Sequence, residues 1–547
     1  MGESGEKRMG STNLLDNLRT EIELQWNDIS RYLHGKYGFE IVEQPTVIFQ
    51  RDEDGISPVG QMSQGHELLI PSSYQKHLSL LRALLSFHCF KASFPVSSIC
   101  KECVHDLSME FARQQLGSAD STRWLKIWKE VTPPRKELVS IVYDPARAYE
   151  WLESVSGNQG FTAILDEIIY SQKHGISLSF EDYLVYFRER AIQFVNHLDD
   201  LDIRLLSALF RDPTINSNEL AEDTGISRTW VTKKLNVLRE TRVMRRYERV
   251  PFSSIDIRIL YVLLTNSQYE GDVLSLIVHC PFLYSYQRIL SGEGHALAVL
   301  CVPSNPLSMK SLQKAFDALG RWGIKSEILQ VASSGTNCCF DFYRPETTSW
   351  NIPWVLLSVQ FNRIVQENLG GIFPRIDEPE NRTSLSLDTF DFQILECVRH
   401  GTSSISQIRK ELQSGQHRVA QRVRELREAK LIVPTIEVRN IGLQEHLFLL
   451  TYDKVHALAL NAFALRLPYS IISFSLEDAL IITLSLPAGG AYSISDVLGR
   501  YNESIRCGML GTKMFGDWGL PTELWDSENQ RWNCPSEGLQ RWLQDLN

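Results

Sequence analysis

One stretch decides the fold: residues 198–250, LDDLDIRLLSALFRDPTINSNELAEDTGISRTWVTKKLNVLRETRVMRRYERV. Apolar residues recur at helical spacing from Asp199 to Phe210, which predicts a first helix. Ser217 is the expected N-cap of a second helix, Thr224-Gly225 the turn after it, and Ser227 the N-cap of a third helix. Three short helices followed by an arginine-rich strand predict a winged helix-turn-helix, which places its third helix in the DNA major groove.

The same apolar spacing returns in residues 387–434, LDTFDFQILECVRHGTSSISQIRKELQSGQHRVAQRVRELREAKLIVP. The matching positions are Leu205-Leu206 and Ile394-Leu395, Leu220 and Ile408, Val231 and Val419, Leu235 and Val423, and Leu238 and Leu426. One residue is lost between the first and second helices, and otherwise the register holds. An internal repeat of this kind predicts that one structural unit is present twice.

A different periodicity follows each unit. Residues 253–333 predict strands at 257–264, 284–290, 295–302 and 325–331, with helices at 272–279 and 308–319. Residues 445–515 predict the same βαββαβ order, which is that of a ferredoxin-like domain. The predicted fold class is therefore α+β and multidomain: two winged helix-turn-helix units, each followed by a ferredoxin-like domain, and a mainly helical N-terminal region before them.

The composition shifts along the chain predict domain boundaries. They give an N-terminal helix and strand region at 1–65, a mainly helical domain at 66–195, winged units at 196–252 and 386–440, ferredoxin-like domains at 253–335 and 441–515, a connector at 336–385, and a Trp-rich tail at 516–547. The tail carries four tryptophans, so we expect it to pack on a domain, because exposed tryptophans at that density would be costly.

Composition limits the class of protein. The chain has 547 residues, too many for one core, and its formal charge of −10 argues against a non-specific nucleic-acid coating protein but not against site-specific binding. No apolar run approaches the roughly 20 residues of a membrane span, and the polar N-terminus lacks a signal peptide, which together predict a cytoplasmic protein. Cys100-x-x-Cys103 lacks a second ligand pair, so we predict no metal and leave metal binding there as an alternative.

The third helix of each unit supplies the candidate DNA contacts, because its first residues face base edges and nearby cations hold phosphates. The candidates in the first unit are Ser227, Arg228, Thr229, Trp230, Lys233, Lys234, Arg242, Arg245 and Arg246. Those in the second unit are Gln416, His417, Arg418, Gln421 and Arg422. A solvated helix face is the alternative for these charges, and for Trp230 a place in the core.

The first repeat resembles the leucine-responsive regulatory protein (Lrp/AsnC) family of bacteria and archaea. The resemblance is carried by Leu198-Asp199-x-x-Asp202 through Leu206, Glu219-Leu220-Ala221, Gly225-Ile226-Ser227, Val231 and Leu235, and in the sensor-like domain by Ile289–Gly292, Gly294–Leu297 and Gly320–Ile324. It implies a DNA-binding transcriptional regulator of archaeal type that responds to a small-molecule effector. The family's sensor Tyr-Asp is replaced by Gly294-His295 and, in the second repeat, by Glu477-Asp478.

The resemblance also implies pairing of two such domains, either in a homodimer or within one chain as a pseudo-dimer. We predict double-stranded DNA as the partner, no membrane, no cofactor and no enzymatic activity, since no P-loop, G-x-S-x-G or HExxH motif is present. Two alternatives stay open: a sirohaem-decarboxylase-like tetrapyrrole enzyme, whose family resembles this one, and a winged-helix protein-interaction module. The residues available to a tetrapyrrole are His279, Arg288, His295, His446, His456 and Arg466.

Overall fold

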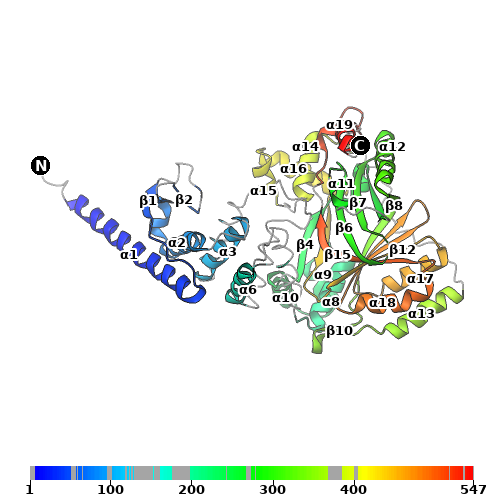
Figure 1. Ribbon diagram of the computed structural model, residues 1–547, viewed down its shortest axis with the longest axis horizontal. Coiled ribbons are helices and arrows are strands. Elements are labelled where there is room, and N and C mark those ends of the chain that lie inside the picture. Colours follow the sequence, from blue (N-terminus) through cyan, green and yellow to red (C-terminus); the bar gives the residue numbers. More distant parts are fainter. Residues whose placement is uncertain are drawn as a thin grey trace. The chain divides into compact units, whose positions relative to one another are not determined.

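The computed structural model places two compact units along the chain, an N-terminal one up to residue 186 and a C-terminal one from residue 197 onward (Figure 1). It describes residues 6–50, 57, 59–63, 66–94, 101–116, 120, 121, 123, 124, 127, 152, 160–174, 186 and 197–545, apart from 242, 267–272, 278, 293, 368–384, 400–403, 516, 517, 534 and 535. Within some helices and strands, such as 6–17 and 512–515, only the backbone is described. No helix among these residues is long and apolar enough to cross a membrane.

The N-terminal unit is mainly helical. Its elements are α1 (Glu6–Tyr37), β1 (Thr46–Gln50), β2 (Gln61–Met62), β3 (Glu67–Pro71), a 3-10 turn at Ser72–Lys76, α2 (Leu78–Ser93), α3 (Lys101–Gln114) and α6 (Phe161–Lys173). The strands form a small sheet in the order β1-β3-β2, with β1 and β3 parallel. Trp26, Phe87 and Phe90 are among the fully buried side chains, so the unit has a core of its own.

The C-terminal unit begins with three short helices, α8 (Asp200–Arg211), α9 (Ser217–Thr224) and α10 (Arg228–Glu240). The predicted turn is present, because Gly225 ends α9 in the left-handed conformation at φ +70°. Asn216, and not Ser217, is the N-cap of α9: its side chain accepts hydrogen bonds from the backbone N–H groups of Asn218 and Glu219. Either residue type suits an N-cap, so sequence alone could not decide between neighbours.

A second set of three helices follows later in the chain, α14 (Thr389–Arg399), α15 (Ile405–Glu411) and α16 (Gln416–Glu428). Strand β4 (Met244–Arg249) follows the first set and β11 (Val433–Val438) the second. The two strands pair antiparallel with each other, from Val433 opposite Arg249 to Val438 opposite Met244. Each expected wing strand therefore finds its partner in the other repeat.

The two βαββαβ regions join into one closed eight-stranded barrel. The first contributes β5 (Ile257–Asn266), β6 (Leu283–Gly292), β7 (Ala296–Pro303) and β8 (Ile324–Cys338), and the second β12 (Glu445–Thr451), β13 (Tyr469–Ser475), β14 (Leu480–Leu486) and β15 (Arg506–Phe515). Within each region the order is that of a ferredoxin-like sheet, and the sheets join where β8 pairs with β13 and β15 with β6. Pairing of the two domains within one chain was among the expectations, but closure of the paired sheets into a barrel was not predicted.

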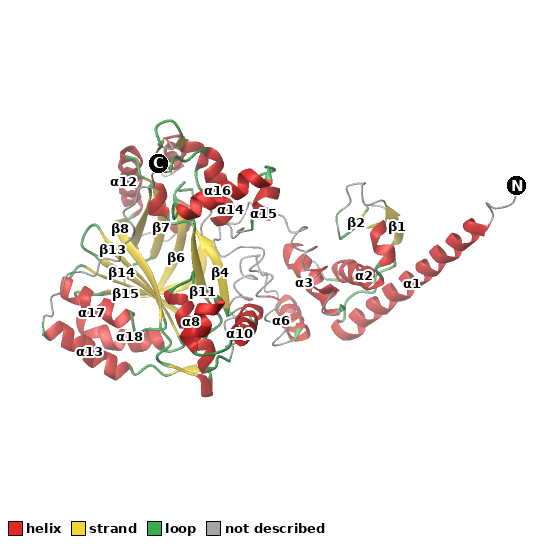
Figure 2. Cartoon of the chain, turned by 180° about the vertical axis from the view of Figure 1, so that it is seen from behind, coloured by secondary structure: helices red, strands yellow, loops and turns green. Residues whose placement is uncertain are grey.

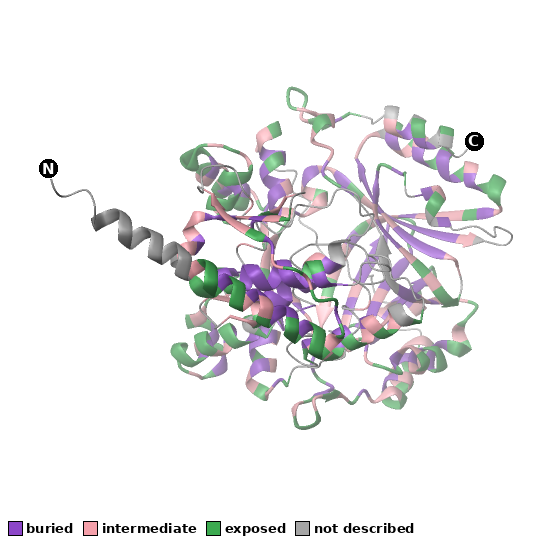
Figure 3. Cartoon of the chain, turned by 60° about the vertical axis from the view of Figure 1, so that its left-hand side comes forward, coloured by how far each residue is buried: buried purple, intermediate pink, exposed green. Residues whose placement is uncertain are grey.

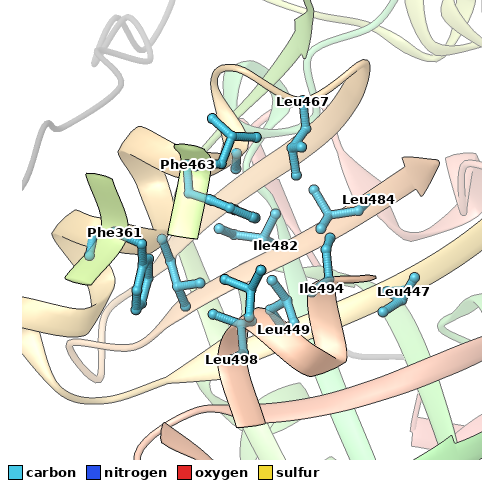
Figure 4. Packing of buried hydrophobic residues seen from close by; sticks show 14 of the residues in the cluster. Phe361, Leu447, Leu449, Phe463, Leu467, Ile482, Leu484, Ile494 and Leu498 are labelled. Atoms are coloured by element: carbon cyan, nitrogen blue, oxygen red, sulfur yellow. The ribbon is translucent and has the colours of Figure 1, made fainter. Parts of the chain in front are cut away.

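Apolar side chains fill the barrel and cover its outside. Inside lie Tyr261, Leu263, Leu297, Leu329, Phe448, Leu450, Ala479, Ile481 and Leu510. On the outer face, α11 (Val273–Ile277) and α12 (Pro306–Ala318) cover the first sheet, and α17 (Lys454–Ala464) and α18 (Gly490–Leu498) the second (Figures 1 and 2). Figure 3 shows the buried positions along these strands, and Figure 4 the core beneath α17 and α18.

A similar succession of elements follows each set of four barrel strands. After β8 come β9 (Tyr343–Arg344), β10 (Ser349–Trp350) and α13 (Trp354–Gln366), and after β15 come β16 (Trp525–Asp526), β17 (Arg531–Trp532) and α19 (Ser536–Asp545). The sequence carries the signal, since Trp-Asn-x-Pro occurs at 350–353 and again at 532–535. The expected connector and the expected tail are therefore equivalent segments.

The two tryptophans of this motif link the repeats. Trp350 Nε1 donates to the carbonyl oxygen of Ile441 at 2.6 Å, and Trp532 Nε1 donates to that of Ile255 at 2.7 Å. Ile441 follows β11 and Ile255 follows β4, so each indole binds the segment after the expected wing strand of the other repeat. Trp518, Trp532 and Trp542 are buried, which confirms the expectation that the tail packs on a domain.

Candidate nucleic-acid interface

Helix α10 is the centre of the predicted interface. The Ser227 side chain caps it by accepting from the Trp230 backbone N–H, as expected. Val231, Leu235 and Leu238 on its inner side are buried against α8 and α9. Its opposite side is thereby presented outward.

The first residues of α10 are exposed. Ser227, Arg228, Thr229, Trp230 and Lys233 all have exposed side chains. The Trp230 side chain is 44% exposed, which removes the alternative that it belongs to the core. Lys233 Nζ lies 5.0 Å from the centroid of that indole, a cation–π contact of about 0.5–1 kcal/mol at an exposed site. This end of the helix combines a cation with an accessible aromatic surface.

Lys234 has partners inside its own helical unit. Its ammonium lies 2.6 Å from Asp199 Oδ2 and 3.1 Å from Asp202 Oδ2. These two aspartates form the capping box of α8, in which each side chain accepts from the backbone N–H of the other. Burial lowers the pKa of Lys234, but the two carboxylates outweigh burial and its pKa is raised. Lys234 therefore ties α10 to the start of α8.

Arg422 holds the same place in the second set of helices. It is the seventh residue of α16, as Lys234 is of α10, and its guanidinium pairs with Asp391 and, at 2.6 Å, with Glu425. Asp391 belongs to a capping box with Asp388 at the start of α14. Both Asp-x-x-Asp sequences were visible, but pairing them with a cation some 30 residues later requires knowing how the helices pack.

Other α16 candidates are free to face solvent. Gln416, His417 and Arg418 are exposed, and the Arg418 guanidinium lies 4.1 Å from the centroid of the Phe390 ring. Gln421 is exposed as well, with its amide bound to Glu425 at 2.9 Å. The first turn of α16 is thus polar and accessible like that of α10, although Gly415 at its N-cap offers no side-chain cap.

The arginines after α10 lie on the two-stranded ribbon rather than on a hairpin wing. Arg245 is opposite Glu437, and its guanidinium lies 5.4 Å from the ring of Tyr247. Arg246 is exposed and opposite Ile436. Arg242 lies outside the described residues.

The ribbon is tied to α16. Arg427 donates to both carboxylate oxygens of Glu248 at 2.7 and 2.9 Å, which joins α16 to β4. A bidentate Arg–carboxylate pair fixes orientation as well as contact. The second set of helices is therefore fastened to the strand that follows the first set.

No group of three metal-ligating side chains is found among the described residues, and Cys100 lies outside them. The residues considered for a tetrapyrrole are spread over the barrel unit. His279 and Arg288 are exposed, and His446 Nδ1 lies 3.0 Å from Ser485 Oγ. His456 follows Asp453 at the start of α17, and Arg466 lies after its end. His295, whose backbone hydrogen-bonds with Ile289 and Leu264, lies just before β7.

Comparison with known proteins agrees with the geometry of α8 to α10. Residues 198–239 match the AsnC-type helix-turn-helix domain. This match covers the first set of helices, and the second set remains a predicted winged helix-turn-helix. No curated protein matches the chain.

The similar solved structures include a decarboxylase and transcriptional regulators. The siroheme decarboxylase NirDL, in complex with an iron-uroporphyrin III analogue, is 10% identical and covers 63% of this chain and 98% of its own, with a TM-score of 0.33. The leucine response regulatory protein LrpA of Mycobacterium tuberculosis is 18% identical and covers 28% of this chain and all of its own, with a TM-score of 0.19. An AsnC family transcriptional regulator from Agrobacterium tumefaciens is 17% identical and covers 25% and 91%, with a TM-score of 0.20.

These comparisons correct one expectation. The sequence led us to predict that the chain is not an enzyme, yet the siroheme decarboxylase NirDL is among the similar solved structures. An AsnC-type helix-turn-helix and the lack of familiar catalytic motifs are therefore no ground for excluding catalysis, and that prediction is wrong.

Proposed function

We propose that the chain is a sequence-specific DNA-binding transcriptional regulator of Lrp/AsnC type, with α10 and α16 as its two reading helices. The observation that carries the proposal is the exposed first turn of α10, which contains Arg228, Thr229 and Trp230. Lys234 holds this helix against the start of α8 through its ion pairs with two aspartates. A reading helix must be rigid relative to its support, because base contacts tolerate little displacement.

The two repeats act as a dimer built into one chain. The β4–β11 ribbon, the barrel seams and the indole hydrogen bonds of Trp350 and Trp532 all join one repeat to the other. Dimeric helix-turn-helix proteins bind two half-sites at a spacing set by the protein. In this chain the pairing of the two reading helices does not depend on protein concentration, because one chain carries both.

The two half-sites should differ in sequence. Arginine suits guanine, and glutamine suits adenine, at base edges in the major groove. The first turn of α10 reads Arg-Thr-Trp and that of α16 reads Gln-His-Arg. An ordinary homodimer favours a palindromic operator, whereas this chain should favour two unlike half-sites in a fixed orientation.

Binding to pooled genomic DNA fragments at low and moderate salt tests the proposal. We expect the wild-type chain to enrich a few fragments, and the double variant Arg228→Ala with Lys233→Ala to lose that enrichment. The slope of log affinity against log salt concentration should fall by about one for each phosphate contact that the variant loses. Lys454→Ala, an exposed cation on α17, is the matched control and should bind as wild type does.

Enrichment that fails in wild type, or that survives in the α10 variant, would overturn the proposal. The sirohaem-decarboxylase-like alternative would then be tested by incubating the chain with iron-uroporphyrin and recording its visible absorbance.

A further inference from the structure

A cavity of about 300 Å³ lies between α13 and α17, on the outer face of the second sheet. Its lining residues are Leu357, Gln360, Phe361, Arg363, Ile364, Ala459, Ala462, Phe463 and Arg466. Phe361 and Phe463 meet edge to face there, with ring centroids 6.1 Å apart (Figure 4). The size is at the lower end of ligand sites, and the walls are mainly apolar, as such sites usually are.

The equivalent helix on the outside of the first sheet shows which side chain lies at this position there. Counted from the Trp-Asn-x-Pro motif, α13 is equivalent to α19, so Leu357 corresponds to Leu539 and Gln360 to Trp542. Both leucines are 1% exposed, which supports the alignment. Position 360 thus carries a polar side chain, smaller than the indole at the equivalent position.

Beside the first sheet, the indole of Trp542 is packed among apolar side chains. Trp542 is 1% exposed, its ring centroid lies 5.5 Å from that of Phe316, and its Nε1 donates to the carbonyl oxygen of Leu276 on α11 at 2.8 Å. Leu276 corresponds to the cavity residue Phe463, because His279-Cys-Pro aligns with Arg466-Leu-Pro at the entry to the next strand. By this alignment Trp542, which packs against α12 and binds α11, stands where Gln360 stands beside the hollow between α13 and α17.

An unfilled apolar hollow lowers stability, since its lining atoms lose packing contacts. An indole at position 360 would close the hollow in the way that the first half already demonstrates. A ligand that fills the space would offset the same cost.

Arg466 gives the cavity its charge. Arg466 Nη1 donates to Gln360 Oε1 at 3.0 Å, and the guanidinium lies 5.4 Å from the Phe342 ring. Among the described residues it has no carboxylate partner, and the cavity lining contains none. The other lining arginine, Arg363, is 73% exposed and paired with Glu367 at 2.8 Å. A half-buried guanidinium on an apolar wall is suited to a carboxylate, which it can bind through two hydrogen bonds.

We propose that the α13–α17 cavity binds a hydrophobic monocarboxylate, with its carboxylate on Arg466 and its apolar body against Ala459, Ala462 and Phe463. A positively charged or zwitterionic ligand is disfavoured, because the lining offers its ammonium no carboxylate. The site is separate from the DNA-reading helices, so the inference does not depend on the proposed function.

Calorimetric titration of the full chain tests the assignment. The probe is octanoate, compared with 1-octanol and octylamine of the same chain length, all below their aggregation limits. We expect one octanoate per chain, and binding at least tenfold weaker for the alcohol and the amine, because only the carboxylate pairs with the guanidinium.

Two variants locate the site. Gln360→Trp should abolish binding by filling the hollow, as Trp542 does in the other half, and should raise the melting temperature. Arg466→Gln should weaken octanoate at least tenfold while leaving octanol unchanged. Arg500→Gln, an exposed cation outside the lining, is the control and should bind as wild type does. Circular dichroism establishes that each variant is folded.

The proposal is overturned if wild type binds no octanoate at millimolar concentration, if octanol binds equally well, or if the folded Gln360→Trp variant still binds. Ala462→Leu supplies a second filling variant should Gln360→Trp fail to fold, and retained binding in folded Ala462→Leu would equally overturn it.

Discussion

Neighbouring lysines on α10 should respond in opposite ways to mutation. Lys233 is exposed over the Trp230 ring, whereas Lys234 is tied to Asp199 and Asp202. Methionine at either position keeps most of the apolar side chain and removes the charge. Lys234→Met should therefore loosen the three-helix unit, while Lys233→Met should leave its stability almost unchanged and weaken DNA binding.

The magnitude follows from the exposure of each partner. The side chains of Lys234 and Asp202 are 19% and 7% exposed, so their contact contributes about 1.5–2 kcal/mol, as hydrogen bonds to charged groups do. Asp199 is 48% exposed, so its contact adds no more than about 0.5 kcal/mol after screening by solvent. The expected loss on Lys234→Met is about 2 kcal/mol, against less than about 0.5 kcal/mol for Lys233→Met.

Hydrogen exchange is the suitable assay, because a chain with two compact units does not unfold in one two-state step. Amides of α8 and α10 that exchange through opening of the unit should exchange about 30-fold faster in Lys234→Met, since about 1.4 kcal/mol corresponds to tenfold. Coupling in a double-mutant cycle with Asp202→Asn should identify the pair. Equal protection in the two lysine variants, or no coupling, would refute the reasoning.

Two further predictions concern the barrel and the N-terminal unit. Gly292 has a φ of +98°, and a Cβ there would lie 2.1 Å from the carbonyl oxygen of Cys507. Gly292→Ala should therefore weaken the β6–β15 seam by about 2–4 kcal/mol, measured by hydrogen exchange. Gly320→Ala is the control, because the space around Gly320 is open, and it should leave the seam unchanged. Burial lowers the pKa of His88 to about 4, below the unfolded value of about 6.5, so its contribution to stability is complete above about pH 6.5 and is lost as the pH falls towards 4. At pH 5 the loss should be about 2 kcal/mol in the protection of α2, after correction for intrinsic exchange rates, and a His88→Gln variant that kept the same pH dependence would contradict this.

Local pattern was sufficient for most elements of the barrel unit. The predicted strand 257–264 is β5, and the predicted third helix from Ser227 is α10, because alternation and capping are properties of adjacent residues. Strand β8 shows where this stops: the prediction ended at Val331, yet β8 continues to Cys338 through polar residues that pair with β13. Their strand conformation depends on a partner more than 130 residues away.

In the candidate site too, local pattern predicts some features and only the packing of distant segments determines others. The exposed first turns of α10 and α16 lie where helical periodicity places them. Lys234 and Arg422 could not be separated from the other cations by pattern, because their role depends on the distance to the capping aspartates of another helix. The pairing of the predicted wing strand could not be predicted either, since β4 pairs with β11 and not with a neighbouring strand.

We propose that one chain reads two unlike half-sites through α10 and α16. The most direct measurement is a hydroxyl-radical footprint on an enriched DNA fragment, made with wild type, Arg228→Ala and Arg418→Ala. We expect two protected segments on one face of the duplex, with protection of one segment lost in Arg228→Ala and of the other in Arg418→Ala. A single protected segment, or two segments that both variants affect equally, would contradict it.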